Sequence, residues 1–193
     1  MSQNVQNTSL VRGERTLQKL SMQQIVQAFD SVIQKAKNQS VALPKNNSAK
    51  SKLYFAAPWF NELEELIYKK CQCIFDAVSL KSKYEVFWPK DNVYDTPNEA
   101  FLADVREIKS AEIILALVTT LDVGTAWEIG YAYALNKKIV LLGFDESCLM
   151  SHINIMLGFS ADFITIESLQ KLLVGTIEQK DFIKIDNTWQ GKQ

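Results

Sequence analysis

From Lys52 onward, short apolar runs alternate with stretches of helical periodicity, and this alternation constrains the fold more than any other feature of the chain. The apolar runs are rich in β-branched and aromatic residues, which is typical of buried strands. They are Leu53–Ala57, Tyr84–Trp88, Ile113–Val118, Lys138–Leu142 and Phe163–Ile166. The helical patterns cover residues 63–74, 98–109, 124–135 and 168–176.

Strands that alternate with helices predict parallel pairing, because right-handed crossovers return the chain to the same edge of the sheet. The helices then cover both faces, which explains why the strands are apolar throughout. We therefore expect an α/β fold, a flavodoxin- or Rossmann-like parallel sheet of about five strands with helices on both faces. Residues 52–193 are expected to form this domain, which would also be the catalytic one.

Residues 1–51 differ in composition from the rest of the chain and are expected to form an N-terminal extension. They are rich in Gln, Asn and Ser, and basic residues outnumber acidic ones. Within them, Ser21 is placed to cap an amphipathic helix whose Met22, Ile25, Phe29 and Ile33 share one face. Residues 38–51 are expected to be a linker. Since the sheet begins near residue 52, we expect residues 1–48 to be dispensable for folding.

The net charge, the lengths of the apolar runs and the counts of cysteine and histidine exclude several classes of function. The formal net charge is −1, so no basic field is available to hold a nucleic-acid backbone. The longest apolar runs are far too short to span a membrane. Three cysteines without metal or redox spacing and a single histidine argue against a metal site. We expect a cytoplasmic, reduced protein whose carboxylates carry any chemistry. A mitochondrial transit peptide is the less favoured alternative, because acidic residues interrupt the basic N-terminal segment.

The residues that follow the strands are candidates for a site, because ligands of open parallel sheets sit beyond the carboxyl ends of the strands. The first strand leads into Ala56, Trp59 and Phe60, whose small and aromatic side chains would form the floor and wall for a flat ligand. The alternative is a tight strand-to-helix turn in which both aromatic residues pack in the core.

Two of the predicted helices place a carboxylate on an inward face. At 3.6 residues per turn, Asp104 aligns with Phe101 and Ile108, and Glu128 aligns with Tyr131. An inward carboxylate costs free energy unless it is paired or functional. Glu128 also lies about one turn into its helix, where the macrodipole favours an ionised carboxylate suited to nucleophilic attack. A capping or salt-bridged role is the alternative for Asp104.

Asp122 precedes the helix of Glu128, and a helix N-cap is the alternative to a functional role for it. Three carboxylates at one sheet edge indicate glycosidic chemistry. One can trap the sugar covalently while another protonates the leaving group of an oxocarbenium-like transition state. Spacing alone identifies neither the sugar nor the leaving group.

Three segments resemble the nucleoside 2-deoxyribosyltransferase family: Tyr54–Phe60 (YFAAPWF), Phe101–Asp104 (FLAD) and Asp122–Tyr131 (DVGTAWEIGY). The resemblance covers roughly residues 52–166. It implies that Glu128 attacks C1′ of a 2′-deoxynucleoside and holds the sugar covalently. It also implies that Tyr54 orients this nucleophile and that Asp104 handles the proton of the leaving and entering base. Two inversions at C1′ would give net retention.

The resemblance further implies a set of substrate-binding residues. Asp122 would hold sugar hydroxyls, Gly124 belongs to the same motif, and Asp91 lies in a base-side loop. The segment with Asn154 and Met156 resembles one that family members donate to a neighbouring subunit, where Asn154 would contact the sugar 5′-hydroxyl. The expected partners are 2′-deoxynucleosides and free nucleobases, as in nucleotide salvage. The expected assembly is a homo-oligomer built from dimers, up to a tetramer or hexamer, without metal or organic cofactor.

Two alternatives to transfer stay open at this point. A related hydrolase would cleave 2′-deoxynucleosides or their 5′-monophosphates with water, although the loop after the first strand has no cation to bind a phosphate. A non-catalytic nucleotide-binding module is less favoured, because a passive pocket gains little from paired inward carboxylates. Val93 stands where certain relatives carry a base-contacting glutamine, which leaves the choice between purine and pyrimidine open.

Overall fold

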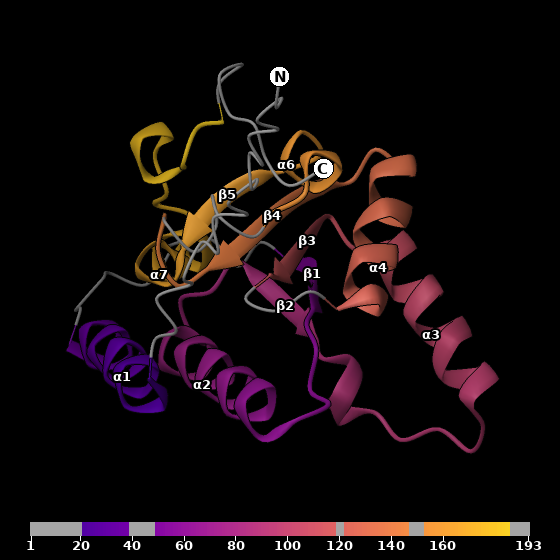
Figure 1. Cartoon of the computed structure of the whole chain (residues 1–193), viewed down its shortest axis with the longest axis horizontal. Coiled ribbons are helices and arrows are strands. Elements are labelled where there is room, and N and C mark those ends of the chain that lie inside the picture. Colours follow the sequence, from indigo (N-terminus) through magenta and orange to yellow (C-terminus); the bar gives the residue numbers. More distant parts are fainter. Residues whose placement is uncertain (1–20, 39–48, 119–121, 147–152, 186–193) are drawn as a thin grey trace, which may run out of the picture.

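The computed structural model describes residues 21–38, 49–118, 122–146 and 153–185, and these form an α/β fold around one parallel sheet (Figure 1). The strand order is β2-β1-β3-β4-β5, and every neighbouring pair is parallel, as the sequence predicts. The strands are β1 (Ser51–Ala56), β2 (Tyr84–Phe87), β3 (Ile113–Leu117), β4 (Lys138–Gly143) and β5 (Asp162–Thr165).

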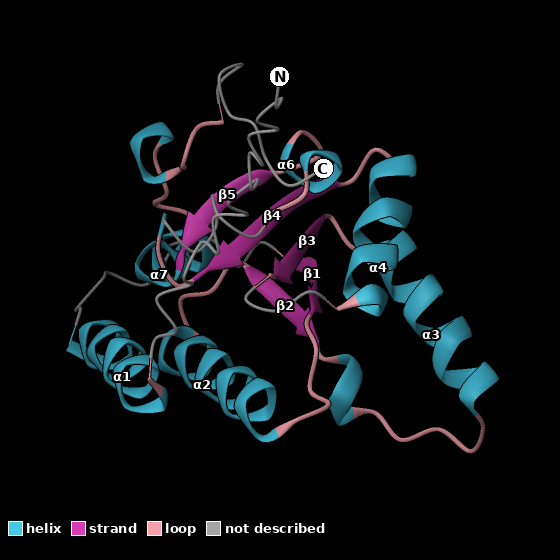
Figure 2. Cartoon of the chain, in the orientation of Figure 1, coloured by secondary structure: helices cyan, strands magenta, loops and turns pink. Residues whose placement is uncertain are grey.

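Helices cover both faces of this sheet (Figure 2). One face packs against α1 (Met22–Asn38), α2 (Glu62–Val78) and α7 (Ile166–Val174), and the other against α3 (Pro97–Ser110) and α4 (Val123–Ala134). Three single-turn helices complete the described elements: η1 (Pro89–Asp91), α6 (Ile155–Gly158) and η2 (Gln179–Asp181).

Successive residues of a strand point to opposite faces, and the two faces therefore have separate cores. On β1, Leu53 and Phe55 belong to the core beneath α1, α2 and α7. Tyr54 and Ala56 belong to the core beneath α3 and α4. This alternation decides which helices Tyr54 can reach, since its ring is fully buried on the α3 and α4 side.

The helix expected in the N-terminal extension is present as α1, and Ser21 caps it, since its side chain accepts a hydrogen bond from the Gln24 N–H at 3.3 Å. Its buried face consists of Ile25, Phe29, Val32, Ile33 and Ala36 and is part of the core of the sheet. The Phe29 ring packs edge-on against Phe144 just after β4, with centroids 5.4 Å apart. Most of the expected linker, residues 39–48, lies outside the described residues.

Two details of helix packing differ from the prediction. Phe101, expected on the inward face of α3, is 50% exposed, because Ala103 and Ile108 form the buried face instead. Met22 is likewise exposed on α1. Whether residues 1–48 are dispensable for folding stays a prediction, although removing them would uncover the core residues that α1 buries.

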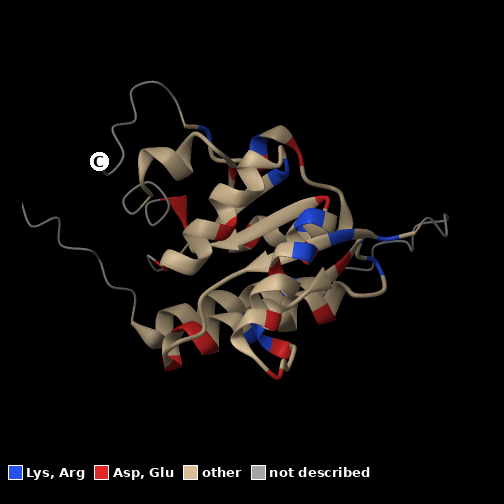
Figure 3. Ribbon diagram, turned by 90° about the vertical axis from the view of Figure 1, so that its right-hand side faces the viewer, with Lys and Arg blue, Asp and Glu red and all other residues tan. Residues whose placement is uncertain are grey.

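None of the helices in the described part of the chain is long and apolar enough to cross a membrane. Figure 3 shows Asp and Glu residues among the Lys and Arg residues of the ribbon, in line with the formal net charge of −1.

Candidate active site

The centre of the candidate site is a hydrogen bond between Tyr54 on β1 and Glu128 on α4. The Tyr54 hydroxyl donates to Glu128 Oε1 at 2.5 Å. Glu128 is half-buried on the side of α4 that faces β1, as the helical spacing predicts. The sheet thus brings together a phenol and a carboxylate that the sequence separates by 74 positions.

The Tyr54 ring is held by the end of the neighbouring strand. Phe87, the last residue of β2, stacks on it with centroids 5.6 Å apart and an interplanar angle of 19°. Because β1 and β2 pair in register at these two residues, the stack follows directly from the sheet. Phe87 therefore fixes the direction in which the Tyr54 hydroxyl points. No sequence motif indicated this role.

Asp104 on α3 is the second carboxylate of the site. Its Oδ1 is buried and has no hydrogen-bond partner in the part of the chain that the structure describes. A buried carboxylate oxygen without a partner is costly to maintain as an anion, and this cost favours proton uptake. Asp104 thus offers an unpaired carboxylate oxygen next to the Tyr54 and Glu128 pair.

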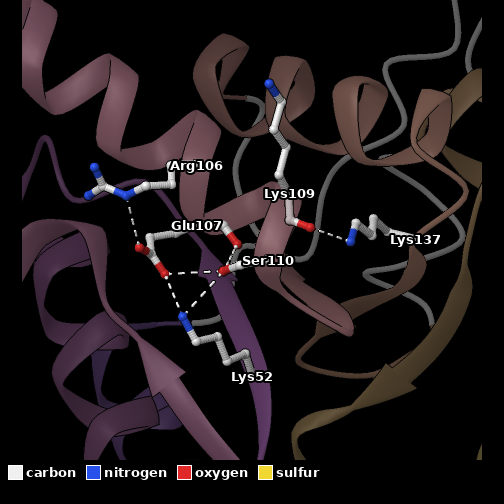
Figure 4. A network of polar contacts seen from close by, with 6 residues as sticks. All are labelled: Lys52, Arg106, Glu107, Lys109, Ser110 and Lys137. Atoms are coloured by element: carbon white, nitrogen blue, oxygen red, sulfur yellow. Dashed lines mark hydrogen bonds and ion pairs between the residues drawn. The ribbon is translucent and has the colours of Figure 1, made fainter.

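A polar network fixes the C-terminal end of the helix that carries Asp104 (Figure 4). Lys52 on β1 lies 3.4 Å from the Glu107 carboxylate. Lys137, just before β4, donates to the main-chain carbonyl of Lys109 at 2.6 Å and so satisfies one of the terminal carbonyls of α3. These contacts connect α3 to β1 and to the residue just before β4. Asp104 lies one turn before Glu107 on the same helix.

The electrostatics of the cluster raise the pKa values of both carboxyl groups. The pKa of Glu128 is raised to about 7, mainly by burial and in part by the charges of Asp104 and Asp122, while the Tyr54 hydrogen bond acts in the opposite direction. Burial also raises the pKa of Asp104, while the nearby Tyr54 hydroxyl lowers it. Burial next to these two carboxylates raises the pKa of Tyr54 well above its usual range. Tyr54 therefore stays protonated and donates its hydrogen bond. The charge of Asp104 influences the protonation of Glu128, so the two carboxyl groups do not titrate independently.

Asp122 is the N-cap of α4, and its side chain accepts a hydrogen bond from the Thr125 N–H at 2.5 Å. The capping alternative is therefore present in the structure, and it leaves the carboxylate close enough to Glu128 to raise its pKa. Gly124 allows this geometry, since a Cβ there would lie 3.1 Å from Asp122 Oδ2. A helix N-terminus that holds one carboxylate and supports another is a favourable place for an anionic nucleophile.

The residues predicted to form the base-side wall lie on the α2 side of the sheet edge. Trp59 is partly buried against Phe60 and Tyr68, whereas the Phe60 side chain is 72% exposed. Asp91 is exposed on η1 and accepts a hydrogen bond from Gln72 of α2 at 2.6 Å. In contrast, the Ala56 side chain is fully buried, which leaves only its main chain for a ligand.

Asn154 and Met156 lie on the opposite side of α4 from Glu128. They line a largely apolar groove of about 680 Å³ between α4 and α6, together with Asp122, Ile129 and Tyr133. Asn154 caps α6, accepting a hydrogen bond from the Met156 N–H at 2.7 Å, and the Met156 side chain is 76% exposed. The groove reaches the carboxylate cluster only through Asp122, so Asn154 does not meet Glu128 of its own chain in the contacts described.

The arrangement of Tyr54, Asp104 and Glu128 supports nucleophilic substitution with proton transfer. One buried carboxylate is oriented by a phenol, and a second has an unpaired oxygen beside it, as in a nucleophile and acid pair. Across residues 21–38, 49–118, 122–146 and 153–185, no group of three or more His, Cys, Asp or Glu side chains is arranged to hold a metal ion.

The chain matches a family model and resembles several solved structures. Residues 53–187 match the family model described as nucleoside 2-deoxyribosyltransferase. The 2-deoxyribosyltransferase of Bacillus psychrosaccharolyticus superposes with a TM-score of 0.52 and 26% identity, over 63% of this chain and 90% of that one. The CMP N-glycosidase of Clostridium botulinum has a TM-score of 0.48 and 25% identity, over 63% of this chain and 97% of that one.

A third solved structure, the 2-desoxiribosyltransferase of Leishmania mexicana, has a TM-score of 0.42 and 20% identity, over 56% of this chain and 71% of that one. A search of curated proteins finds no match to the chain. The family model matches well over half of the chain and includes all the residues of the carboxylate cluster. The chain therefore belongs to the nucleoside 2-deoxyribosyltransferase family.

Proposed function

We propose that this protein transfers the 2-deoxyribosyl group of a 2′-deoxynucleoside from one nucleobase to another, with Glu128 as the nucleophile. The observation that carries the proposal is the hydrogen bond from Tyr54 to Glu128, next to a second carboxylate with an unpaired buried oxygen. Family membership supports the chemical class, and the geometry supports the roles assigned within it.

In the first half-reaction, a Glu128 carboxylate oxygen attacks C1′ while the C1′–N bond to the base breaks. The electron pair of that bond stays on the base, and protonated Asp104 supplies the proton that neutralises it. The product is an ester between Glu128 and C1′ with inverted configuration. Tyr54 keeps the attacking carboxylate in place through its hydrogen bond.

In the second half-reaction, a nitrogen of the entering base attacks C1′, and the ester bond breaks to release the Glu128 carboxylate. The entering base loses its proton to Asp104, which restores the starting state of both carboxyl groups. The second inversion gives net retention at C1′. Atoms and electrons balance among the sugar, the two bases and the two carboxyl groups, so the cycle needs no redox partner.

The remaining site residues are proposed to bind the substrate. Asp122, held at the N-terminus of α4, accepts hydrogen bonds from sugar hydroxyls, and Gly124 leaves it the room to do so. Trp59, Phe60 and the loop with Asp91 flank the base. The main chain at Ala56 lies at the end of β1, where it is proposed to contact the bound nucleoside.

We further infer that a second copy of the chain completes the site. The groove between α4 and α6 is rimmed by exposed apolar side chains, among them Val123, Tyr133 and Phe159, and its burial would stabilise a dimer. Asn154 lies on this rim, across α4 from its own Glu128. Donation of Asn154 to the partner's site would bring it to the sugar 5′-hydroxyl. Larger assemblies of such dimers, a tetramer or hexamer, are compatible with this interface.

N-glycosidase activity is the second candidate, since water in place of the second base would cleave the same ester. The loop after β1 has no Lys or Arg between Ala56 and Phe60, which favours nucleosides over 5′-monophosphates. A binding module without turnover is disfavoured, because a passive pocket gains little from paired inward carboxylates.

Incubation of the protein with 2′-deoxyinosine and adenine tests the proposal, with chromatography of bases and nucleosides. The expected products are 2′-deoxyadenosine and hypoxanthine in equal amounts. Glu128→Ala should lose this exchange by several orders of magnitude, whereas Glu112→Ala, at an exposed glutamate before β3, should keep it. Exchange by Glu128→Ala within about tenfold of the wild type would overturn the assignment.

A further inference from the structure

We propose that three residues of α2, Glu64, Tyr68 and Gln72, are positioning residues that set the distance between the two base-side loops. The inference rests on the proposed function, in which those loops flank the nucleobase. Residues at positions i, i+4 and i+8 of a helix lie one above the other along a single face. We call these three residues the α2 row. Glu64 contacts the loop after β1, Gln72 contacts the loop after β2, and Tyr68 contacts both.

Glu64 fixes the loop that follows β1. Its carboxylate accepts a hydrogen bond from the Phe60 N–H at 2.9 Å, and its own N–H donates to the Asn61 side chain at 3.0 Å. Glu64 is only 7% exposed, so the hydrogen bond is largely shielded from water. The Phe60 side chain projects into solvent, and its direction is therefore set by the main chain that Glu64 holds.

Tyr68 lies between the two loops. Its ring packs edge-on against Trp59 of the first loop, with centroids 5.9 Å apart. It also packs edge-on against Trp88, which precedes η1, with centroids 5.4 Å apart. Tyr68 is 1% exposed and cannot move without disturbing both tryptophans. The Tyr68 ring thus spaces one loop from the other.

Gln72 fixes the loop that follows β2. Its side-chain amide donates to Asp91 Oδ2 at 2.6 Å. The adjacent Lys90 is held from the same helix, since it donates to Glu65 at 2.6 Å and lies 5.7 Å from the Tyr68 ring centroid. One helix therefore holds both loops.

The α2 row makes the spacing of the two base-side loops depend on a single helix. The two loops begin at the ends of β1 and β2, and the pairing of these strands is the first point that fixes the spacing of the loops. The α2 row is the second such point. A change in the row should alter how tightly a base binds. It should leave the carboxylate chemistry intact, because Glu128, Asp104 and Tyr54 contact other elements.

The test measures the affinity for free adenine by calorimetry, together with KM and kcat for base exchange, in four variants of the full chain. Glu64→Ala should weaken adenine binding and raise KM about tenfold, as expected for one lost hydrogen bond to a charged group, with kcat within about twofold. Gln72→Ala should weaken adenine binding and raise KM by only about threefold, because the hydrogen bond from Gln72 to Asp91 is exposed. Glu64→Gln, which keeps an acceptor for the Phe60 N–H, should stay close to the wild type. Glu62→Ala is the matched control, since Glu62 is an exposed glutamate in the same first turn of α2.

The outcomes separate this inference from the proposed function. If the wild type exchanges bases but Glu64→Ala and Gln72→Ala bind adenine as the wild type does, the α2 row is refuted and the function stands. If the wild type binds adenine without exchange and the variants bind it more weakly, the row stands and the function fails. A uniform loss of kcat with unchanged KM would indicate a merely structural role and overturn the row. Should Glu64→Ala fail to fold, Gln72→Ala decides the question.

Discussion

The Tyr54 hydroxyl donates a 2.5 Å hydrogen bond to the carboxylate of Glu128. The donor comes from a central strand and the acceptor from the helix that follows the next strand of the sheet. The bond orients a carboxylate whose pKa burial has raised to about 7, so a large part of it is ionised near neutral pH. Three predictions concern this carboxylate and its neighbours, and two concern the assembly and the fate of the sugar.

The first prediction concerns the pH dependence of kcat/KM. The nucleophile must be ionised, so kcat/KM should rise with pH through an acid limb near the pKa of Glu128, about 7. The Tyr54 hydrogen bond lowers this pKa, and Tyr54→Phe should therefore move the limb to higher pH. Initial rates at low substrate concentration across the pH range measure it. A limb that keeps its position or moves to lower pH in Tyr54→Phe would contradict the assignment.

The same raised pKa predicts a pH-dependent gain in stability for Glu128→Gln. The pKa of Glu128 lies near 7 in the folded protein and near 4.5 in the unfolded chain. Its contribution to the free energy of unfolding is complete below pH 4.5 and is lost as the pH rises through 7. A neutral glutamine side chain at this position avoids the loss, so the variant should be more stable above pH 7 by about 3 kcal/mol. Urea unfolding of the wild type and of Glu128→Gln, below pH 4.5 and above pH 7, checks the prediction. An equal difference in the free energy of unfolding at the two pH values would argue against the raised pKa.

For Asp104, the expected signature of an acid is dependence on the leaving base. Asp104→Asn keeps the shape of the side chain but cannot donate its proton to the departing base. The variant should slow the release of poor leaving bases by about 10²- to 10⁴-fold and that of good ones much less. Rates of base release from a series of 2′-deoxynucleosides measure the slope. An equal loss across the series would indicate that Asp104 is structural.

How far the sequence predicts the site depends on the kind of contact. Asp104 and Glu128 were expected to face inward because helical periodicity aligns them with apolar residues, and parallel topology brings both toward β1. The stack of Phe87 on Tyr54 was not predictable, because it depends on the register of two strands that the sequence does not specify. The contact of Glu64 with the Phe60 N–H had one signal, the spacing of Asn61 and Glu64 that is typical of a helix N-terminus.

Among the helices and strands, too, some features were predictable from the sequence and others were not. The five strands and their parallel pairing were predicted, since both follow from the order of apolar runs and helices. The amphipathic pattern around Phe29 predicted a helix but not the surface that it covers, which the structure identifies as the core beside α2 and α7. On α3, the exposed Phe101 contacts Trp127 of α4, a surface contact that periodicity cannot distinguish from burial.

The proposed donation of Asn154 predicts complementation between an inactive Glu128→Ala chain and an Asn154→Ala chain with raised KM or lowered kcat. Glu128→Ala and Asn154→Ala chains, mixed and allowed to exchange subunits, should form dimers in which one site has both residues intact. Random exchange at equal amounts should restore about a quarter of the sites. Activity of the mixture relative to each variant alone measures it, with the separately stored variants as controls. If the mixture is no more active than its components, each site is built from a single chain.

The central claim is that the deoxyribosyl group passes from base to base, and the fate of the sugar tests it most directly. The measurement follows free deoxyribose and new nucleoside from 2′-deoxyinosine as adenine is raised to about millimolar concentration, near the usual upper range of KM. A transferase should form 2′-deoxyadenosine in large excess over free deoxyribose, and added adenine should suppress deoxyribose release, because the entering base competes with water for the Glu128 ester. Release of deoxyribose that dominates even at high adenine would contradict transfer and identify the protein as a hydrolase.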